Sequence, residues 1–425
     1  MTPLDASSPR PSFTKSAAAN IRTSWETSYL RPLTRIELDS IVAIMPAWLH
    51  RREWRPPWGA DVRLLWEYID RHGLAGALGA LSAADLVPPG ELAERAKDRY
   101  FSNMVHCERA MKQCRKIVAA ARELGLPIVN FKGPALAEQA YGDSGVRAFS
   151  DLDLWTASRD DVFKLLAALG ARITDDSDRK GPIRRMRAPD RISATLDGWE
   201  LEIRYPAGES TDPMLDLLNR YPAAAPPTGN DCLGAPNPAW HLLLLILHMS
   251  WYHYSSRFVW YLDLAALAAR RRRGIDFEWV LQECRRLRAT NLMGLASRFC
   301  RENIDPSFPE FPLDPAAWNY KFLCLVSNPR TIACGRFSLH QRTTSKMYYT
   351  LWFRTMRHYL LSDPSPRYIP NFPPESWMIA TITRSFRVTG ALSHYAARLI
   401  VGWVAYPLAR FSAWILTVRT PGGGS

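Results

Sequence analysis

Three acidic residues in two parts of the chain have the spacing of a metal site. Asp151 and Asp153 flank Leu152, so a strand at this point would place both carboxylates on one face and the leucine on the other. Two carboxylates held side by side repel each other unless a cation lies between them. Hard divalent cations bind oxygen, and Mg²⁺ takes one or two carboxylates together with phosphate oxygens. Glu202, in a later predicted strand, would supply a third ligand and permit two metal ions.

Basic and small residues close to the acidic pair suit a bound triphosphate. Two metal ions about 4 Å apart activate the attacking oxygen and steady the leaving oxygen of a phosphoryl transfer. Lys132 would neutralise the phosphates as a point charge, and Arg147 as a two-pronged fork. Gly133, where a strand turns into a helix, would let the backbone approach a phosphate. Ser150, directly before Asp151, completes this predicted phosphate-binding group.

Each of these features alone has a simpler explanation. A pair of aspartates such as Asp151 and Asp153 is more often a solvated strand end, and Lys132-Gly133 begins an ordinary turn into a helix. Glu202 would line the exposed face of an edge strand as readily as it would bind a metal. The order of the features favours the metal site: a basic residue and glycine, a helix, an arginine, two carboxylates, and a third carboxylate after a meander.

The elements that must position these residues alternate between strands and helices. In chain order we predict a strand at 127–131, a helix at 134–141, a strand at 151–155, a helix ending at Gly170 that is capped by Ser158, and antiparallel strands at 183–188, 191–196 and 199–205. Pro189-Asp190 and Asp197-Gly198 mark the turns between the last three strands. This order predicts an α+β fold built on a small mixed sheet.

Helical patterns flank the predicted sheet on both sides in the sequence. We therefore expect a disordered lead-in at 1–30, an N-terminal helical region at 31–125, a catalytic domain at 126–225, a C-terminal helical domain at 226–420 and a tail or tag remnant at 421–425.

The segment around the acidic pair resembles a known family. Its carriers are FKGPALA from Phe131, YGD from Tyr141, and VRAFSDLDL from Val146 to Leu154. These runs resemble the uncharacterised bacterial nucleotidyltransferase family of the polymerase-beta-like superfamily, which reads roughly KG-x-x-L, Y-x-D and R-x-x-S-D-x-D-L. The resemblance implies a polymerase-beta-like fold with Asp151, Asp153 and Glu202 as the catalytic metal ligands. The implied reaction transfers a nucleoside monophosphate from a nucleoside triphosphate and releases pyrophosphate, with Mg²⁺ or Mn²⁺ as cofactor.

The sequence departs from this family in two places. The usual glycine-serine or glycine-glycine turn is Gly133-Pro134 here, and a histidine two residues after the third carboxylate is replaced by Arg204. A weaker likeness extends to a helical segment with paired histidines and an aspartate. From these features we predict acceptor-side roles for His248, His253, Asp263 and Arg204. Packing between helices is the simpler explanation for the histidines, including His241.

Three kinds of partner fit the sequence. Members of the resembled family occur in gene clusters for peptide natural products and polysaccharides, which favours a small-molecule or peptide acceptor. The balance of 54 basic and 41 acidic residues gives a net charge of +13, which also suits nucleotide addition to RNA. A third alternative is a non-catalytic nucleotide-binding or membrane-surface module that uses the apolar helix predicted within residues 391–419.

Composition indicates a water-soluble cytoplasmic protein. Hydrophobic residues make up 47% of the chain, and the longest apolar run, Leu399–Ala409, is shorter than the roughly 18 residues that a membrane span needs. We therefore predict no transmembrane segment. The seven cysteines include no CxxC pair, which indicates reduced thiols, and Cys107 and Cys114 are predicted to pack in the core.

Overall fold

The computed structural model describes most of the chain from residue 33 to residue 313. The described ranges are 33–176, 191–206, 233–253, 257–287 and 289–313, together with Met214, Leu217, Leu218, Arg220, Pro329 and Ile332.

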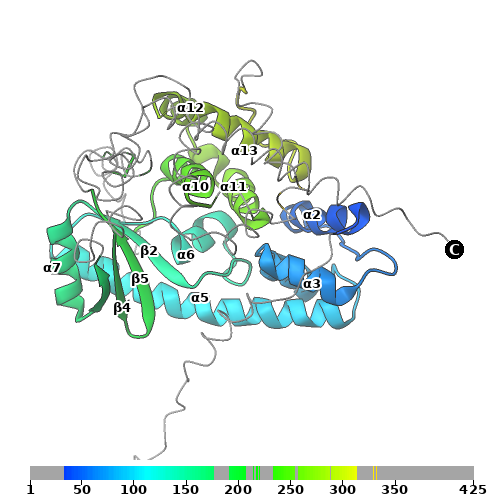
Figure 1. The fold of residues 1–425 in the computed structure, drawn as a ribbon, viewed down its shortest axis with the longest axis horizontal. Coiled ribbons are helices and arrows are strands. Elements are labelled where there is room, and N and C mark those ends of the chain that lie inside the picture. Colours follow the sequence, from blue (N-terminus) through cyan, green and yellow to red (C-terminus); the bar gives the residue numbers. More distant parts are fainter. Residues whose placement is uncertain are drawn as a thin grey trace, which may run out of the picture.

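Within the described residues four helices precede the sheet, and the first two begin with a side-chain cap. They are α2 (Arg35–His50), α3 (Val62–Arg71), α4 (Ala75–Ala83) and α5 (Glu91–Glu123). Thr34 and Glu37 form a reciprocal capping box at the start of α2, and Asp61 accepts a hydrogen bond from the Leu64 backbone at the start of α3. Helix α5 contains 33 residues and runs from the sheet to α3 and α4 (Figure 1).

The sheet has five strands in the order β1-β2-β5-β4-β3. Its elements are β1 (Ile128–Asn130), α6 (Gly133–Leu136), η1 (Ala137–Tyr141), β2 (Asp151–Thr156), α7 (Arg159–Leu169), β3 (Arg172–Asp176), β4 (Arg191–Leu196) and β5 (Trp199–Arg204). Strands β2 and β5 pair in parallel, whereas the other neighbours are antiparallel. The prediction of an α+β fold with a small mixed sheet is confirmed.

Strand β3 is a feature that the sequence analysis did not predict. The predicted strand at 183–188 lies outside the described residues, and the strand that pairs with β4 on the side away from β5 is Arg172–Asp176. This strand lies at the edge of the sheet, and its one apolar side chain, Ile173, is 40% exposed. An exposed edge strand carries little apolar alternation, so the pattern on which the prediction depended is absent.

The helix predicted at 134–141 begins as expected but changes character halfway. Its first turn is α6, and from Ala137 to Tyr141 the backbone widens into a π-helix, η1. Single π-helical turns are rare and occur frequently at functional sites. The widened turn carries Tyr141, which belongs to the candidate site described below.

In the part of the chain that the structure describes, helices α10 to α13 follow the sheet and lie on the other side of the molecule from α5 (Figure 1). They are α10 (Pro238–His253), α11 (Phe258–Arg271), α12 (Phe277–Arg286) and α13 (Thr290–Asn303), with a short 3₁₀ turn, η2 (Arg272–Gly274), after α11. Buried side chains of these helices and of α2, α3 and α4 form one hydrophobic core that includes Phe131 and Trp155. The predicted domain boundaries stay predictions.

A second hydrophobic core lies between the sheet and the helices α5 and α7. Strand residues such as Leu152 and Leu201 are fully buried there, beside Cys107 and Cys114 of α5. This confirms that both cysteines pack in the core. Because side chains alternate along a strand, the neighbours of Leu152 and Leu201 project to the opposite face of the sheet.

None of the helices in the described ranges is both long and apolar enough to cross a bilayer. The apolar segment within residues 391–419 lies outside those ranges.

Candidate active site

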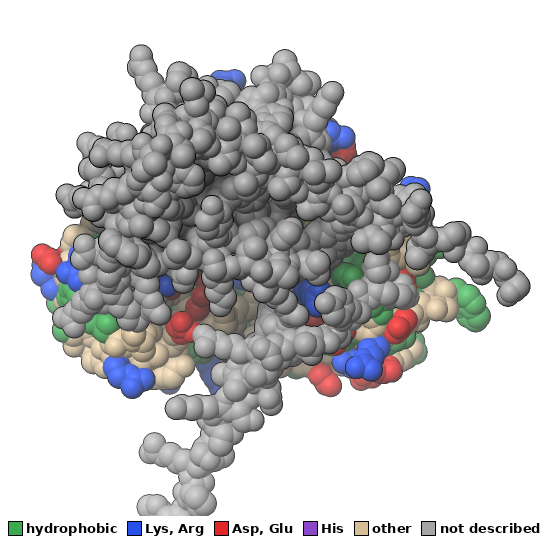
Figure 2. All heavy atoms as spheres, viewed as in Figure 1, with side chains coloured by type: hydrophobic (Ala, Val, Ile, Leu, Met, Phe, Trp, Pro, Cys, Tyr) green, Lys and Arg blue, Asp and Glu red, His purple; other side chains and the backbone are tan. Residues whose placement is uncertain are grey.

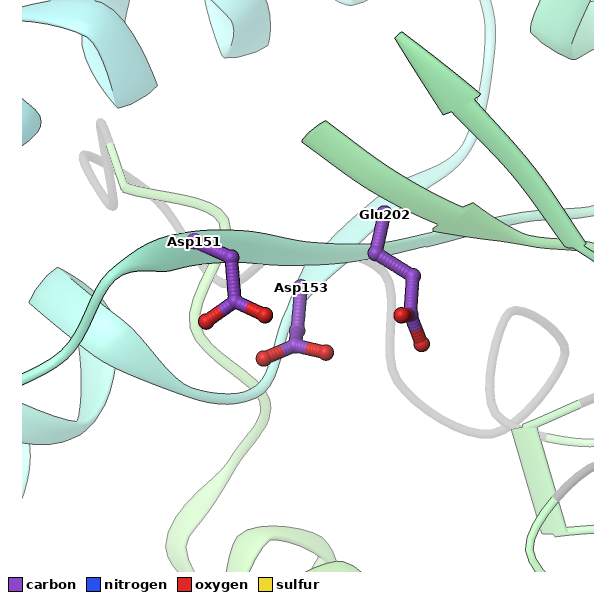
Figure 3. A group of neighbouring side chains, drawn as sticks. All are labelled: Asp151, Asp153 and Glu202. Carbon is purple, nitrogen blue, oxygen red and sulfur yellow. The ribbon is translucent and has the colours of Figure 1, made fainter. Parts of the chain in front are cut away.

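The three predicted metal ligands meet on one face of the sheet. The parallel register pairs Asp151 with Glu200 and Asp153 with Glu202, so Glu202 lies beside Asp153 on the next strand. Asp151, Asp153 and Glu202 each offer a carboxylate oxygen, and these oxygens all lie within 4.8 Å of one another. Their side chains point to the same side of the sheet (Figure 3).

The chemistry of this cluster fits a hard divalent cation. All three donors are carboxylate oxygens, which Mg²⁺ and Mn²⁺ prefer. The pKa of Asp151 is raised from its ordinary value of 3.8 to about 6, first by burial and then by the neighbouring charge of Asp153, with a smaller contribution from Glu202. The ionised cluster is therefore under electrostatic repulsion, which a bound cation would relieve.

Three cations already lie against the cluster. Lys132 donates from Nζ to Oδ2 of Asp153 at 2.9 Å. Arg191 donates from Nη1 to Oε2 of Glu202 at 2.7 Å, and Arg204 donates from Nη2 to Oε1 of the same carboxylate. Burial on its own would raise the pKa of Glu202, but the guanidinium groups of Arg204 and Arg191 hold it below its ordinary value. The site thus combines three carboxylates with three basic side chains.

Gly133 brings the turn after β1 against the start of β2. Its φ of 53° lies in the left-handed region, which glycine adopts without strain. A side chain built there would meet the carbonyl oxygen of Asp151 at 3.4 Å and the ring of Phe149 at 3.5 Å. These are ordinary contact distances, so the feature that favours glycine here is the positive φ; the preceding residue, Lys132, lies against Asp153.

Ser150 lies at the exposed rim of the cluster. Its hydroxyl donates to Oδ1 of Asp151 at 3.4 Å, a long contact. The structure therefore places Ser150 beside the first carboxylate.

Arg147 and Asp263 lie together inside the protein, although the sequence analysis gave them separate roles at the phosphates and at the acceptor. Nε of Arg147 donates to Oδ1 of Asp263 at 2.8 Å, and the Tyr141 hydroxyl donates to the same oxygen at 2.5 Å. The carboxylate is 1% exposed. Burial would lower the pKa of Arg147, but the Asp263 carboxylate holds it above its ordinary value, with a smaller effect from Asp153. Direct contacts of Arg147 with phosphate and of Asp263 with an acceptor stay predictions.

The histidines of α10 have a packing role where the structure describes them. His241 hydrogen-bonds through Nδ1 with Oε1 of Gln139 at 2.7 Å and through Nε2 with the carbonyl of Phe131 at 2.9 Å. Burial lowers its pKa to about 4, against the opposing effect of the Phe131 carbonyl. His241 is fully buried, as the prediction of a histidine packed between helices requires, and it lies against η1 and the residue after β1. His248 is buried with its ring centroid 6.3 Å from that of Phe131, and the side chain of His253 is outside the described set.

Arg191 is a site residue that the sequence analysis missed. Strand β4 pairs with β5 so that Ser193 lies opposite Glu202 and Arg191 lies opposite Arg204. Arg191 is therefore diagonal to Glu202 on the same face, within reach of a long side chain. The predicted strands 191–196 and 199–205 contained the signal, but only their register reveals it.

Comparison with known proteins identifies the family of this chain. Residues 59–305, more than half of the chain, match a family model described as uncharacterised nucleotidyltransferase. Two solved structures are similar over a smaller share. One is the crystal structure of ANT(2″)-Ia in complex with adenylyl-2″-tobramycin, with 16% identity over 42% of this chain and 97% of that chain and a TM-score of 0.28. The other is the solution structure of the antibiotic-resistance factor ANT(2″)-Ia, with 16% identity over 43% and 92% and a TM-score of 0.28. A search of curated proteins found no match.

Proposed function

Because the chain belongs to the family of uncharacterised nucleotidyltransferases, we propose that it moves a nucleoside monophosphate from a nucleoside triphosphate to a small-molecule or peptide acceptor. Mg²⁺ or Mn²⁺ is the proposed cofactor. In this reaction a nucleophilic atom of the acceptor forms a bond to the α-phosphorus, and the bond from that phosphorus to the bridging oxygen breaks. The acceptor loses a proton, and pyrophosphate leaves.

One observation supports the chemistry most strongly. Asp151, Asp153 and Glu202 present carboxylate oxygens within 4.8 Å of one another from two adjacent parallel strands. Divalent cations bound by these oxygens would stabilise charge on the attacking and leaving oxygens of the transfer, in the two-metal arrangement. The raised pKa of Asp151 supports this proposal, since it reflects negative charge gathered in a partly buried place.

The basic residues have proposed roles on the phosphate side. Lys132 lies against Asp153, where its ammonium group would also neutralise a triphosphate bound at the cluster. Gly133 keeps the backbone beside β2 free of a side chain, and Ser150 adds a hydroxyl donor at the rim. Arg147 would contribute its positive charge from the interior. Arg204, which holds Glu202, is the proposed link to the acceptor side.

The proposed acceptor is a small molecule or a peptide. The family resemblance favours a small molecule or a peptide. In the view of Figure 2, basic and acidic side chains lie next to one another where described residues are visible. A cytoplasmic location remains part of the proposal, supported by the free thiols of Cys107, Cys114, Cys284 and Cys300.

The test follows the label of each nucleoside triphosphate. Purified protein is incubated with each of the four α-labelled triphosphates and Mg²⁺, alone and with a small-molecule, a peptide and an RNA fraction of a bacterial extract. We expect pyrophosphate release and transfer of the label with at least one triphosphate. The labelled species then identifies the acceptor class, and label on the protein itself reveals self-modification.

Matched variants tie the activity to the cluster. The double variant Asp151→Asn/Asp153→Asn should lose at least about a hundredfold in rate, the scale of removing one essential charge contact in a transition state. Glu200→Gln removes an exposed carboxylate from the same face of β5 and should retain most of the activity. Equal losses in both variants would mean that the cluster has no special role. No pyrophosphate release with any triphosphate and fraction would contradict the proposed function.

A further inference from the structure

Two arginines lie directly opposite each other on the face of the sheet that carries Asp151, Asp153 and Glu202. Arg191 of β4 pairs with Arg204 of β5 in the antiparallel register. Like charges in directly opposed positions of antiparallel strands destabilise the pairing. The two guanidinium groups therefore need an anion close to both of them.

Glu202 is that anion. Its Oε2 accepts a hydrogen bond from Arg191 at 2.7 Å, and its Oε1 accepts one from Arg204. Both oxygens of a carboxylate in the candidate metal cluster are thus engaged by the arginine pair. A divalent cation at the cluster and the two arginines would compete for one negative charge.

We propose that Arg191 is a polyphosphate-binding residue that exchanges Glu202 for phosphate when Glu202 takes a divalent cation. Once the charge of Glu202 is shared with a metal, Arg191 and Arg204 lose hydrogen bonds to this carboxylate, and a polyphosphate beside the cluster replaces them. Metal and polyphosphate then bind more strongly together than separately. The metal draws Glu202 away from the arginines, and the polyphosphate supplies the arginines with another anion. This inference rests on the proposed function, since it takes the cluster to bind metal and triphosphate.

The structure favours Arg191 over Arg204 for the exchange. The side chain of Arg191 is 33% exposed, whereas that of Arg204 is 10% exposed. Arg191 also begins β4, so its side chain lies at the end of the strand. Its planar guanidinium presents parallel N–H groups that match two phosphate oxygens, as they match a carboxylate.

The test measures metal binding and polyphosphate binding separately. Mn²⁺ affinity is measured without polyphosphate from the electron paramagnetic resonance signal of free Mn²⁺. Affinity for inorganic tripolyphosphate, which carries no base, is then measured by calorimetry at saturating Mn²⁺. We expect Arg191→Gln to bind Mn²⁺ alone more tightly, by about fivefold, and tripolyphosphate more weakly, by about fivefold or more, the lower end of typical coupling between sites.

Two further variants separate charge from structure. Arg191→Lys keeps the charge, so its affinity for Mn²⁺ alone should stay close to that of the wild type. Arg172→Gln makes the same change in net charge on exposed β3, one strand further from Glu202, and should change neither affinity. Thermal unfolding of each variant verifies that it is folded.

Changes in the same direction for both ligands in Arg191→Gln would overturn the inference, as would no change in either. So would a wild-type protein that fails to bind Mn²⁺ or tripolyphosphate. Failure of the proposed function is distinguishable, because it would appear as absent pyrophosphate release from a protein that still binds Mn²⁺ and tripolyphosphate.

Discussion

Among the three carboxylates of the cluster, Asp151 has a raised pKa. Lys132 is paired with Asp153, and two arginines are paired with Glu202, while the pKa of Asp151 is raised to about 6 by burial and by Asp153. An ionised Asp151 is therefore a destabilising group at neutral pH, as expected for its proposed role as a metal ligand. Strain of this kind is common at functional sites.

We predict that Asp151→Asn stabilises the fold while it abolishes transfer. The folded-state pKa of about 6 lies above the ordinary 3.8, so the folded protein binds more protons than the unfolded chain between these values. The wild type thus carries the full penalty above pH 6 and loses it as the pH falls towards 4. Urea unfolding in a chelating buffer at pH 7.5 should show a gain on the order of 1 to 3 kcal/mol, with little gain at pH 4.

The control for this prediction is Glu200→Gln. Glu200 is exposed, and its charge comes last among the causes that raise the pKa of Asp151, so its substitution should change the free energy of unfolding by less than about 0.5 kcal/mol. A gain for Asp151→Asn that did not depend on pH would show that the ionisation of Asp151 is not its cause.

At the scale of elements, a glycine in α4 allows this helix to pack against the loop that carries Arg147. A side chain at Gly76 would lie 2.2 Å from the carbonyl oxygen of Val146 and 2.5 Å from that of Gly145. Both contacts are with backbone atoms, which do not move aside as the end of a flexible side chain would. The position of Arg147 therefore depends on a helix that contributes no residue to the candidate site.

We predict that Gly76→Ala destabilises the protein by about 1 to 3 kcal/mol, the usual range for overpacking a core. Alanine is the better helix former by about 1 kcal/mol, so a net loss of stability must come from the clash with the loop. Chemical denaturation provides the measurement.

Gly274→Ala adds the same methyl group where the nearest atom, in Pro238, is 3.7 Å away, and should be tolerated. If Gly76→Ala were as stable as Gly274→Ala, the close packing of α4 on the loop would be disproved.

Sequence reasoning found the elements whose own residues carry a clear hydrophobic pattern. Strands β2 and β5 alternate polar and apolar residues because the apolar side chains of one face pack against α5 and α7. The shared face of Asp151 and Asp153 therefore followed from the two-residue period of a strand alone. Strand β3 was missed because it is an exposed edge. The π-helical turn was missed because nothing in the composition of Ala137–Tyr141 distinguishes it from an α-helix.

Sequence reasoning missed two contacts of the candidate site, for different reasons. Arg147 and Asp263 were both identified, but nothing in the sequence pairs residues on a loop and on a helix far along the chain. Arg191 is a different case, because the two-residue turn at Asp197-Gly198 sets the register of β4 and β5 and thereby places Arg191 diagonal to Glu202. The sequence thus contains the signal for Arg191, whereas the pairing of Arg147 with Asp263 depends on tertiary packing, which spacing along the chain does not encode.

At the scale of the whole molecule, the buried pair of Arg147 and Asp263 ties the loop before β2 to α11. Tyr141 adds a third side chain from η1 to the same carboxylate oxygen. All three side chains are buried, so each depends on the others for its hydrogen bonds. Removing one partner of such a buried pair leaves an uncompensated charge.

We predict that Asp263→Asn destabilises the protein by about 3 to 5 kcal/mol, because it leaves the buried Arg147 charge unpaired. Asp39→Asn is the matched control, since it breaks an Arg–Asp pair with Arg35 at the surface and should cost less than about 1 kcal/mol. Unfolding by denaturant compares the two.

A fully stable Asp263→Asn protein with impaired transfer would instead favour the acceptor-side role that the sequence analysis assigned to Asp263.

The parallel pairing of β2 with β5 also has a consequence for the time course of folding. The hairpin of β4 and β5 closes over a two-residue turn, whereas β2 reaches β5 only after a long crossover through α7, β3 and β4. Closing a long loop costs more chain entropy and is slower than forming a hairpin. We therefore expect Glu202 to meet Asp151 and Asp153 late, when most of the sheet has formed. The nascent chain would thus be spared the mutual repulsion of its acids until enough structure exists to withstand it.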